Sequence, residues 1–314
     1  MKNIQIISMV LIICIISSIA IVQKQEQKTN IGMAVEFNDH AACAYVAEEM
    51  GWYEDEGINF TVYKSYATGM RLAGALARGD IQVAYICLSP AILAYARGVP
   101  IKIVAGTHKH GYGLVVSPEV TDIPDLKGKT IGCVREGGPA DLLLNRLIMK
   151  YNLTDVRIKR MNPLNQVIAL ETGRIDAVFL PEHHATVADS KGFHMLIKSQ
   201  DLWPDMQGSV LVVKTDLIEN DPETVRKLTR VTQKATDWVN ENPDNASIIL
   251  ANVLDTKPGV INKSMSRLDY TTEINAESVQ EMIDYMMELG YIDEKIKAED
   301  ILDTRFLQEG KYEN

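Results

Sequence analysis

The sequence predicts an α/β protein with two lobes, each a mostly parallel sheet flanked by helices, and three observations support this fold class. From residue 30 onward, short apolar β-like runs alternate with helical patterns, as in chains of βαβ units. Two segments, ALARGDIQVAYI at 75–86 and ALETGRIDAVFL at 169–180, share one order of helix end, glycine cap and buried strand, which indicates two similar halves. After Pro222 the pattern becomes helical, so extra C-terminal helices are expected to pack on the α/β body.

The expected elements follow from these patterns in chain order. Strands are predicted at 31–35, 60–63, 83–86, 101–105, 114–116, 130–134, 156–160, 177–180, 195–197 and 210–213. Helices are expected between them, near 41–54, 70–78, 91–97, 140–151, 164–172 and 184–191. From Pro222, three helices with no strand among them are expected at 222–242, 245–253 and 276–289.

The chain is expected to pass twice between the lobes. Glycines and short strands cluster near 111–113 and 207–210, which favours crossings there. Residues 30–112 and 208–314 would then form a discontinuous lobe 1, and residues 113–207 would form lobe 2. Residues 1–29 stand apart as an N-terminal segment.

The N-terminal segment indicates export. Lys2 is followed by the nearly uncharged run IQIISMVLIICIISSIAIV at 4–22 and then by the polar stretch QKQEQK. This is typical of a signal peptide, and the run is also long enough to act as a membrane anchor. Ile13 precedes Cys14 where a lipoprotein signal needs a small residue, so lipidation is not expected. An extracytoplasmic location follows, either secreted to or anchored on the outer face of the cell membrane.

Composition excludes some classes of function. The 314 residues are 46% hydrophobic, enough for real cores, and the net charge is −10 with no Lys/Arg run, so no nucleic-acid partner is expected. Cys43, Cys87 and Cys133 lie in separate apolar segments without CxxC spacing, which favours buried thiols over a disulfide framework.

Polar residues gather where predicted strands lead into helices. In open α/β sheets, ligands bind beyond the carboxyl ends of strands, against helix N-termini with free N–H groups. Five such junctions are EFNDH at 36–40, SYATG at 65–69, CLSP at 87–90, REGGP at 135–139 and PEHH at 181–184. A cleft between two lobes would collect all five. Each junction also has a purely structural interpretation, since Ser89-Pro90 and Gly138-Pro139 fit ordinary helix capping.

No catalytic or metal motif stands out. The chain lacks a GxSxG elbow, a P-loop and a GxGxxG after the first strand, and no cofactor is expected. His108-x-His110 and His183-His184 lack the i, i+4 spacing of a helical zinc pair, so no metal is expected either. No carboxylate pair is selected by its spacing as hydrolytic machinery.

Residues 45–60, YVAEEMGWYEDEGINF, resemble the "yvAkekGyfeeeGldv" helix near the start of type 2 periplasmic binding proteins, which serve ABC importers. The resemblance continues in order through 75–84, 89–91, 97–101 and LKGKTIG at 126–132, and it covers about 31–242. The nearest groups are the nitrate, sulfonate and taurine binders and the binders of thiamine-pyrimidine precursors. The subgroup is mixed, because Asn38-Asp39-His40 resembles the pyrimidine binders and Leu88-Ser89-Pro90 the sulfonate binders.

The resemblance implies a hinge protein that clamps a small organic or anionic solute between its lobes without chemistry. Its partners would be the small-molecule ligand and the permease and ATPase subunits of an ABC importer, and a monomer is expected. Two alternatives stay open: an enzyme on the same fold, of the thiamine-pyrimidine synthase or menaquinone-pathway type, and a sensory ligand-binding lobe. The synthase's lysine and histidine positions hold Ile86 and Pro90 here, and its CCCFC stretch is absent, which argues against the enzyme.

The candidate ligand-binding residues come from the five junctions and the first crossing. They are Glu36, Phe37, Asn38, His40, Thr68, Leu88, Ser89, His108, Tyr112, Arg135, Gly138, Pro139, Glu182 and His183. Phe37 and Tyr112 would be apolar or stacking walls, and Thr68 and Ser89 helix-start donors. For His40, the alternative to a cleft contact is a place at a helix start capped by Asn38 or Asp39.

The charge of the ligand stays open. Arg135 suits a sulfonate or carboxylate, because guanidinium binds planar and tetrahedral oxyanions well. Glu36 and Glu182 favour a ligand with an amine or ring N–H instead. Sequence does not decide between them.

Overall fold

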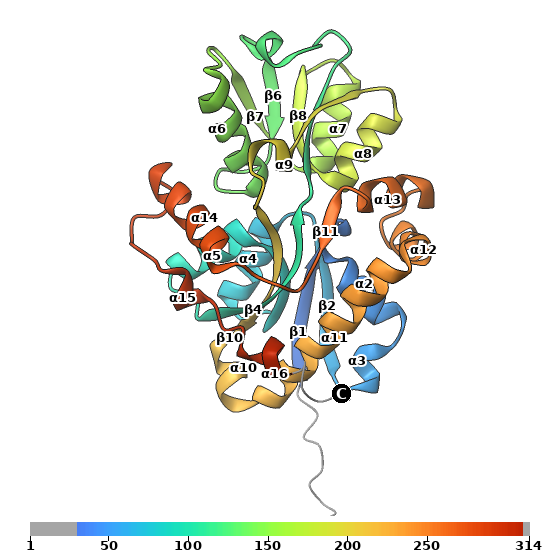
Figure 1. The fold of residues 1–314 in the computed structure, drawn as a ribbon, viewed down its shortest axis with the longest axis vertical. Helices are drawn as coiled ribbons and strands as arrows, with labels where there is room; N and C mark the ends of the chain where they lie inside the picture. Colours follow the sequence, from blue (N-terminus) through green and yellow to red (C-terminus); the bar gives the residue numbers. More distant parts are fainter. Residues whose placement is uncertain (1–29, 310–314) are drawn as a thin grey trace, which may run out of the picture.

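The computed structural model describes residues 30–309, so the predicted signal peptide or anchor at 1–29 lies outside the described residues. The molecule is elongated, with one sheet in each of two lobes stacked along its long axis (Figure 1). The predicted α/β class with two lobes is confirmed. Within the described range, no helix is both long and apolar enough to cross a bilayer.

The larger sheet, which we call sheet A, has the strand order β11-β4-β10-β3-β1-β2. Its strands are β1 (Asn30–Glu36), β2 (Asn59–Tyr66), β3 (Val83–Cys87), β4 (Ile101–His110), β10 (Gln207–Lys214) and β11 (Leu268–Tyr270). β1 pairs in parallel with β2 and β3, whereas β10 runs antiparallel to both β3 and β4. β3 is buried along its whole length, as expected for a central strand covered on both faces.

The second sheet, sheet B, has the order β7-β6-β8-β5-β9. Its strands are β5 (Tyr112–Val116), β6 (Thr130–Cys133), β7 (Arg157–Arg160), β8 (Ala177–Pro181) and β9 (His194–Lys198). β6 is parallel to β7 and β8, and β5 is antiparallel to β8 and β9. Both sheets are therefore mixed, less parallel than the sequence predicted, because β5 and β10, the strands that follow the two crossings, run antiparallel to their neighbours, as does β11 at the edge of sheet A.

Helices cover both sheets. In the first half of the chain they are the 3₁₀ turn η1 (Asp39–Ala41), α2 (Ala42–Glu49), α3 (Trp52–Asp55), α4 (Gly69–Arg78) and α5 (Leu88–Ala96). Those around sheet B are η2 (Ile123–Leu126), α6 (Pro139–Tyr151), α7 (Pro163–Glu171), α8 (Glu182–Ser190) and α9 (Ser199–Leu202). The C-terminal ones are α10 (Thr215–Asn220), α11 (Pro222–Glu241), α12 (Pro243–Val253), α13 (Pro258–Met265), α14 (Ala276–Glu288), α15 (Ala298–Ile301) and α16 (Arg305–Glu309).

Two expectations about individual elements are wrong. The helix predicted over 41–54 is broken at Gly51, which adopts φ +72° and separates α2 from α3. A strand does occur after Pro222: β11 adds three residues to the antiparallel edge of β4. Three residues are too few to show a period of two, so sequence gives no signal for it.

The first crossing between the sheets is a tight turn at residues 110–111. His110 and Gly111 both have positive φ, 63° and 85°, between the end of β4 and the start of β5. A Cβ on Gly111 would lie 2.9 Å from His40 Nε2, so only glycine fits both the backbone angle and the space. The second crossing runs from α9 to β10, at 203–206.

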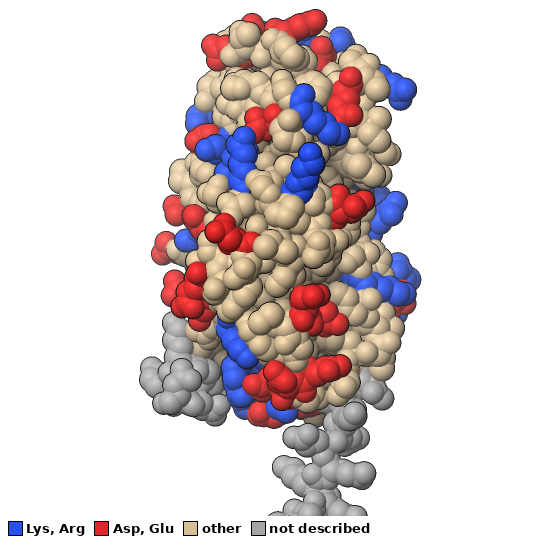
Figure 2. All heavy atoms as spheres, turned by 90° about the vertical axis from the view of Figure 1, so that its right-hand side faces the viewer, with Lys and Arg blue, Asp and Glu red and all other residues tan. Residues whose placement is uncertain are grey.

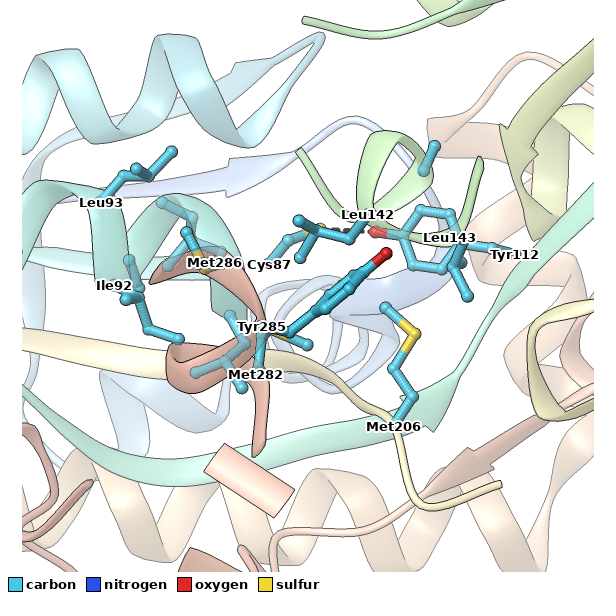
Figure 3. Close-up of a cluster of buried hydrophobic side chains, with 14 of the residues drawn as sticks. Cys87, Ile92, Leu93, Tyr112, Leu142, Leu143, Met206, Met282, Tyr285 and Met286 are labelled. Carbon is cyan, nitrogen blue, oxygen red and sulfur yellow. Dashed lines mark hydrogen bonds between the residues drawn. The ribbon is translucent and has the colours of Figure 1, made fainter. Parts of the chain in front are cut away.

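One hydrophobic cluster continues from lobe to lobe (Figure 3). Leu93 on α5 belongs to it from the sheet A side, Leu143 on α6 from the sheet B side, and Met282 and Met286 from α14 (Figure 3). Each such fully buried side chain contributes about 1.5–3 kcal/mol. The C-terminal segment therefore joins the lobes as well as covering them, with α13 and α14 on opposite sides of the molecule (Figure 1).

The face shown in Figure 2 carries acidic and basic side chains interspersed with broad uncharged areas. Charges of both signs occur on both lobes in this view (Figure 2).

Candidate functional site

The candidate site is a cavity of about 50 Å³ between the lobes. One water needs about 10–15 Å³ on this measure, so the space holds a handful of waters or a small organic group. Its wall is formed by Glu36, Asn38, Ala67, Thr68, Gly69, Met70, Cys87, Pro90, Tyr112, Val134, Arg135, Gly138, Pro139, Pro163, Pro181 and His184. Apart from Tyr112 at the start of β5, these residues come from the ends of strands in both sheets, the loops after them and the starts of the helices that follow, which is where ligands bind in α/β folds.

Glu36, the last residue of β1, is the one acidic residue among those that line the cavity, with 4% of its surface exposed. Its Oε1 accepts a hydrogen bond of 2.7 Å from the backbone N–H of Cys87, and its Oε2 accepts one of 3.4 Å from the Asn38 amide. Burial raises the pKa of Glu36, and hydrogen bonds from Cys87, Asn38 and the Gly69 backbone oppose that shift. The carboxyl group is thus held in place from three sides.

Asn38 and Thr68 complete the sheet A side of the polar wall. The Asn38 Oδ1 accepts the backbone N–H of His40 at 3.0 Å and thereby caps η1. Thr68 is the N-cap residue of α4, but its hydroxyl forms no capping bond to the helix. The Asn38 oxygen is therefore committed to the fold, whereas the Thr68 hydroxyl is not used as a cap.

Tyr112 enters the cavity from the start of β5. Its hydroxyl lies 2.9 Å from the Cys87 sulfur (Figure 3), and burial raises the pKa of both groups well above their usual range. Both therefore stay protonated at neutral pH. The pair links a strand of each sheet directly across the cavity.

The sheet B side is made largely of prolines, glycine and two basic side chains. His184 lies on the first turn of α8, and burial lowers its pKa well below 6.5, so its imidazole is neutral. Arg135 is exposed and lines both this cavity and an outer hollow of about 300 Å³ that also contacts Arg71 and Arg160. Arg160 is neutralised by Asp141 at 2.5 Å, whereas Arg71 and Arg135 form no ion pair with any residue in 30–309.

Seven of the fourteen predicted residues line the cavity: Glu36, Asn38, Thr68, Tyr112, Arg135, Gly138 and Pro139. The other seven do not, and their placement differs. Phe37 is not part of the wall and has 36% of its surface exposed, and Leu88 and Ser89 are fully buried in the first turn of α5. The Ser89 hydroxyl has no hydrogen-bond partner in the described part of the chain.

His40 and His108 do not line the cavity and form a buried pair of rings, tilted by 45° to each other, near the first crossing. Their ring centroids lie 4.3 Å apart, and His40 Nε2 is 2.8 Å from the Gly111 carbonyl oxygen. Burial lowers the pKa of His108 to about 3 and that of His40 well below its usual range. The two rings are therefore neutral and support the crossing.

Glu182 and His183 lie on the first turn of α8 but outside the cavity. Glu182 Oε1 accepts hydrogen bonds from Arg267 at 2.8 Å and from the Thr186 hydroxyl at 2.9 Å. Arg267 also reaches Asp189 at 3.2 Å, so one guanidinium from the segment between α13 and β11 pairs with two acids of α8. These contacts join the C-terminal segment to the sheet B lobe.

Sequence reasoning missed several wall residues, among them Gly69, Cys87, Pro90, Pro163 and His184. Four of these lie in or next to junctions that the sequence did single out, so their position was signalled but their orientation was not. Among residues 30–309, no group of three or more His, Cys, Asp or Glu side chains is placed to hold a metal ion.

Two lobes joined by two crossings, with a cavity walled by both, place the chain in the two-lobed fold class of solved periplasmic binding proteins. Within it, the chain belongs to the NMT1/THI5 like family, whose sequence profile matches residues 38–246.

Two proteins of similar sequence support this assignment. A Bacillus subtilis (strain 168) protein provisionally named as an aliphatic sulfonates-binding protein is 25% identical over 285 residues, 86% of this chain and 85% of its own. The taurine-binding periplasmic protein of Escherichia coli (strain K12) is 26% identical over 238 residues, 73% of this chain and 72% of its own. Both relatives are binding proteins by name.

A similar solved structure is the ligand-binding component of an ABC-type import system from Staphylococcus aureus, crystallised with zinc bound. Its TM-score is 0.82 at 18% identity, covering 90% of this chain and 99% of that one. At this identity the likeness shows the fold alone.

Proposed function

We propose that this protein is the extracytoplasmic solute-binding component of an ABC importer, and that it captures a small solute between its lobes and releases it unchanged to a permease and ATPase. The observation that carries the proposal is the cavity itself, whose wall is shared by strand ends of both sheets. A site divided in this way is completed when the lobes close and dismantled when they open.

The named relatives support a solute with an acidic group, since one is a sulfonate binder by name and another binds taurine. The unpaired Arg135 at the cavity fits such a group. The small volume of the cavity favours a compact solute over a large cofactor. We propose that the seven predicted residues at the wall contact this solute and that the protein acts as a monomer.

A role without chemistry is supported by the residues that stand where the related synthase needs its lysine and histidine. Ile86 is fully buried in β3 and Pro90 occupies the first turn of α5. Neither side chain can form a Schiff base or transfer a proton. The alternative of a sensory lobe has no observation in the described residues that favours it.

The test combines native mass spectrometry of the purified protein with binding measurements. We expect a small solute to be retained in the protein as isolated, and thermal unfolding to shift upward with one of nitrate, ethanesulfonate, taurine or an aminopyrimidine. Arg135→Gln and Tyr112→Ala would lower the affinity for that solute. Turnover of any of these compounds by the pure protein, monitored by mass spectrometry, would contradict a transport role.

A further inference from the structure

The wall of the cavity contains two helix starts with the same peculiarity. α4 follows Thr68 and α5 follows Cys87, and neither helix receives a capping hydrogen bond from its N-cap side chain. The first N–H groups of a helix lack partners within the helix and attract negative charge. Two uncapped helix starts beside one cavity would ordinarily be a good place to bind an anionic ligand.

In this protein the carboxyl group of Glu36 already occupies the position between the two helix starts. Glu36 Oε1 accepts the N–H of Cys87 at 2.7 Å and also faces the backbone of Gly69, the first residue of α4. The fit is tight, because a Cβ on Gly69 would lie 2.3 Å from that same oxygen. Glu36 is 4% exposed, so its carboxyl group is built into the wall and serves both helices at once.

Other groups of the wall do not offer a replacement anion site in the inner cavity. The Tyr112 hydroxyl and the Cys87 thiol lie within hydrogen-bond distance of each other, and the Asn38 oxygen caps η1. His184 carries no charge, since burial lowers its pKa well below 6.5. The unpaired cation Arg135 is exposed and extends to the outer hollow.

We propose that Glu36 takes the position of a ligand anion at the two helix starts, so that the solute presents an N–H donor to this carboxyl group rather than an oxyanion to the helices. The chemical class is an amine, amidine or ring N–H compound. An acidic group, where the solute has one, lies toward Arg135. This inference rests on the proposed solute-binding function and names the solute class within it.

The physical reason is the low dielectric of the wall. An oxyanion placed beside Glu36 would meet a carboxyl group whose neighbouring N–H donors are used, and it would lose its own hydration without compensation. An N–H donor, by contrast, satisfies the remaining lone pairs of Glu36. Selectivity between the two kinds of solute follows from this one side chain.

The test uses matched pairs of solutes that differ by an amino group. The pairs are taurine with ethanesulfonate, and 4-amino-5-hydroxymethyl-2-methylpyrimidine with the same pyrimidine lacking the amino group, each titrated into the full chain by calorimetry. For the pair that binds, we expect the amino compound to bind at least ten-fold more tightly. In Glu36→Gln this preference falls below about three-fold, while Glu49→Gln, the same substitution at the exposed end of α2, keeps it.

The wild-type preference decides the inference even where Glu36→Gln does not fold, and native mass spectrometry adds a second readout. Equal binding of ethanesulfonate and taurine, tight binding of nitrate, or a retained solute without an N–H group would overturn the role of Glu36 and leave the solute-binding function standing. A protein that retains no solute and binds none of the probes would instead overturn the proposed function, and the inference with it.

Discussion

Two glutamates follow the strand ends of the two lobes, and the structure gives them different surroundings. Glu36 ends β1 and is held by backbone and side-chain groups of its own lobe while it faces the cavity. Glu182 starts α8 and is held by Arg267 from the C-terminal segment, outside the cavity. The same residue type at the same kind of junction is thus part of the wall in one lobe and part of a connection between lobes in the other.

The two sides of the cavity are therefore stabilised in different ways. The sheet A side is organised by its own hydrogen bonds, whereas the start of α8 depends on a cation supplied from elsewhere. The following predictions test that difference, from the largest expected effect to the smallest.

Arg267→Met should destabilise the protein most. It leaves Glu182, whose side chain is 1% exposed, without its cation, and breaking such a buried pair costs about 3 kcal/mol of unfolding free energy. The matched control is Lys263→Met, because that half-exposed lysine shares Asp189 with Arg267 and should cost less than about 1 kcal/mol. Urea unfolding of both variants measures the difference, and equal losses would show that Glu182 does not depend on Arg267.

Gly69→Ala should disturb the surroundings of the Glu36 carboxyl group. The new Cβ would stand 2.3 Å from Glu36 Oε1 and 2.9 Å from Pro90, so the wall must shift, at a cost of about 2 kcal/mol and with weaker solute binding. Gly74→Ala on the same helix meets only the end of the Arg78 side chain and should stabilise the protein by about 0.5–1 kcal/mol. If both substitutions behave alike, the Glu36 carboxyl group is not fixed in position.

Asp39→Asn should change how stability depends on pH. Burial raises the pKa of Asp39 to about 7, with Glu182 adding to the shift and the Ser264 hydroxyl opposing it. Between about pH 4 and pH 7 the folded protein keeps a proton that the unfolded chain releases, so this residue lowers stability as pH rises, by about 1.4 kcal/mol per pH unit.

The variant lacks this titration, so its unfolding free energy should improve relative to wild type by that slope from pH 4.5 to 6.5 and then level off above pH 7. Chemical unfolding at four pH values measures it. Asp293→Asn, at an exposed carboxyl, serves as the control and should leave the wild-type slope unchanged. A constant difference between Asp39→Asn and wild type would contradict the shift.

Arg135→Gln should leave the fold intact and act on binding alone. The side chain is exposed and unpaired, so the unfolding free energy should change by less than about 0.5 kcal/mol. Affinity for taurine should fall about five-fold, and the loss should shrink in high salt because screening weakens the ion pair. Arg97→Gln, at a residue that is also exposed and lies at the end of α5, should change neither quantity. An unchanged affinity would remove Arg135 from the site.

Sequence reasoning located the strands and the junctions because local patterns determine them. It did not determine which of two neighbours faces the cavity: His183 was predicted and His184 lines the wall, and one step along a helix rotates the side chain by about 100°. Arg267 was not predicted at all, because it lies 85 residues from Glu182 and no local pattern connects them. Such contacts are set by how the lobes pack.

The three cysteines of the described range have a practical consequence. Cys43, Cys87 and Cys133 are all buried and unpaired, and burial raises the pKa of each thiol, that of Cys43 to about 12. Thiols in this state react slowly with maleimides. A cysteine introduced at the exposed Phe37, next to the cavity residue Asn38, would therefore take up a fluorescent dye in preference to these three thiols and report optically on solute binding.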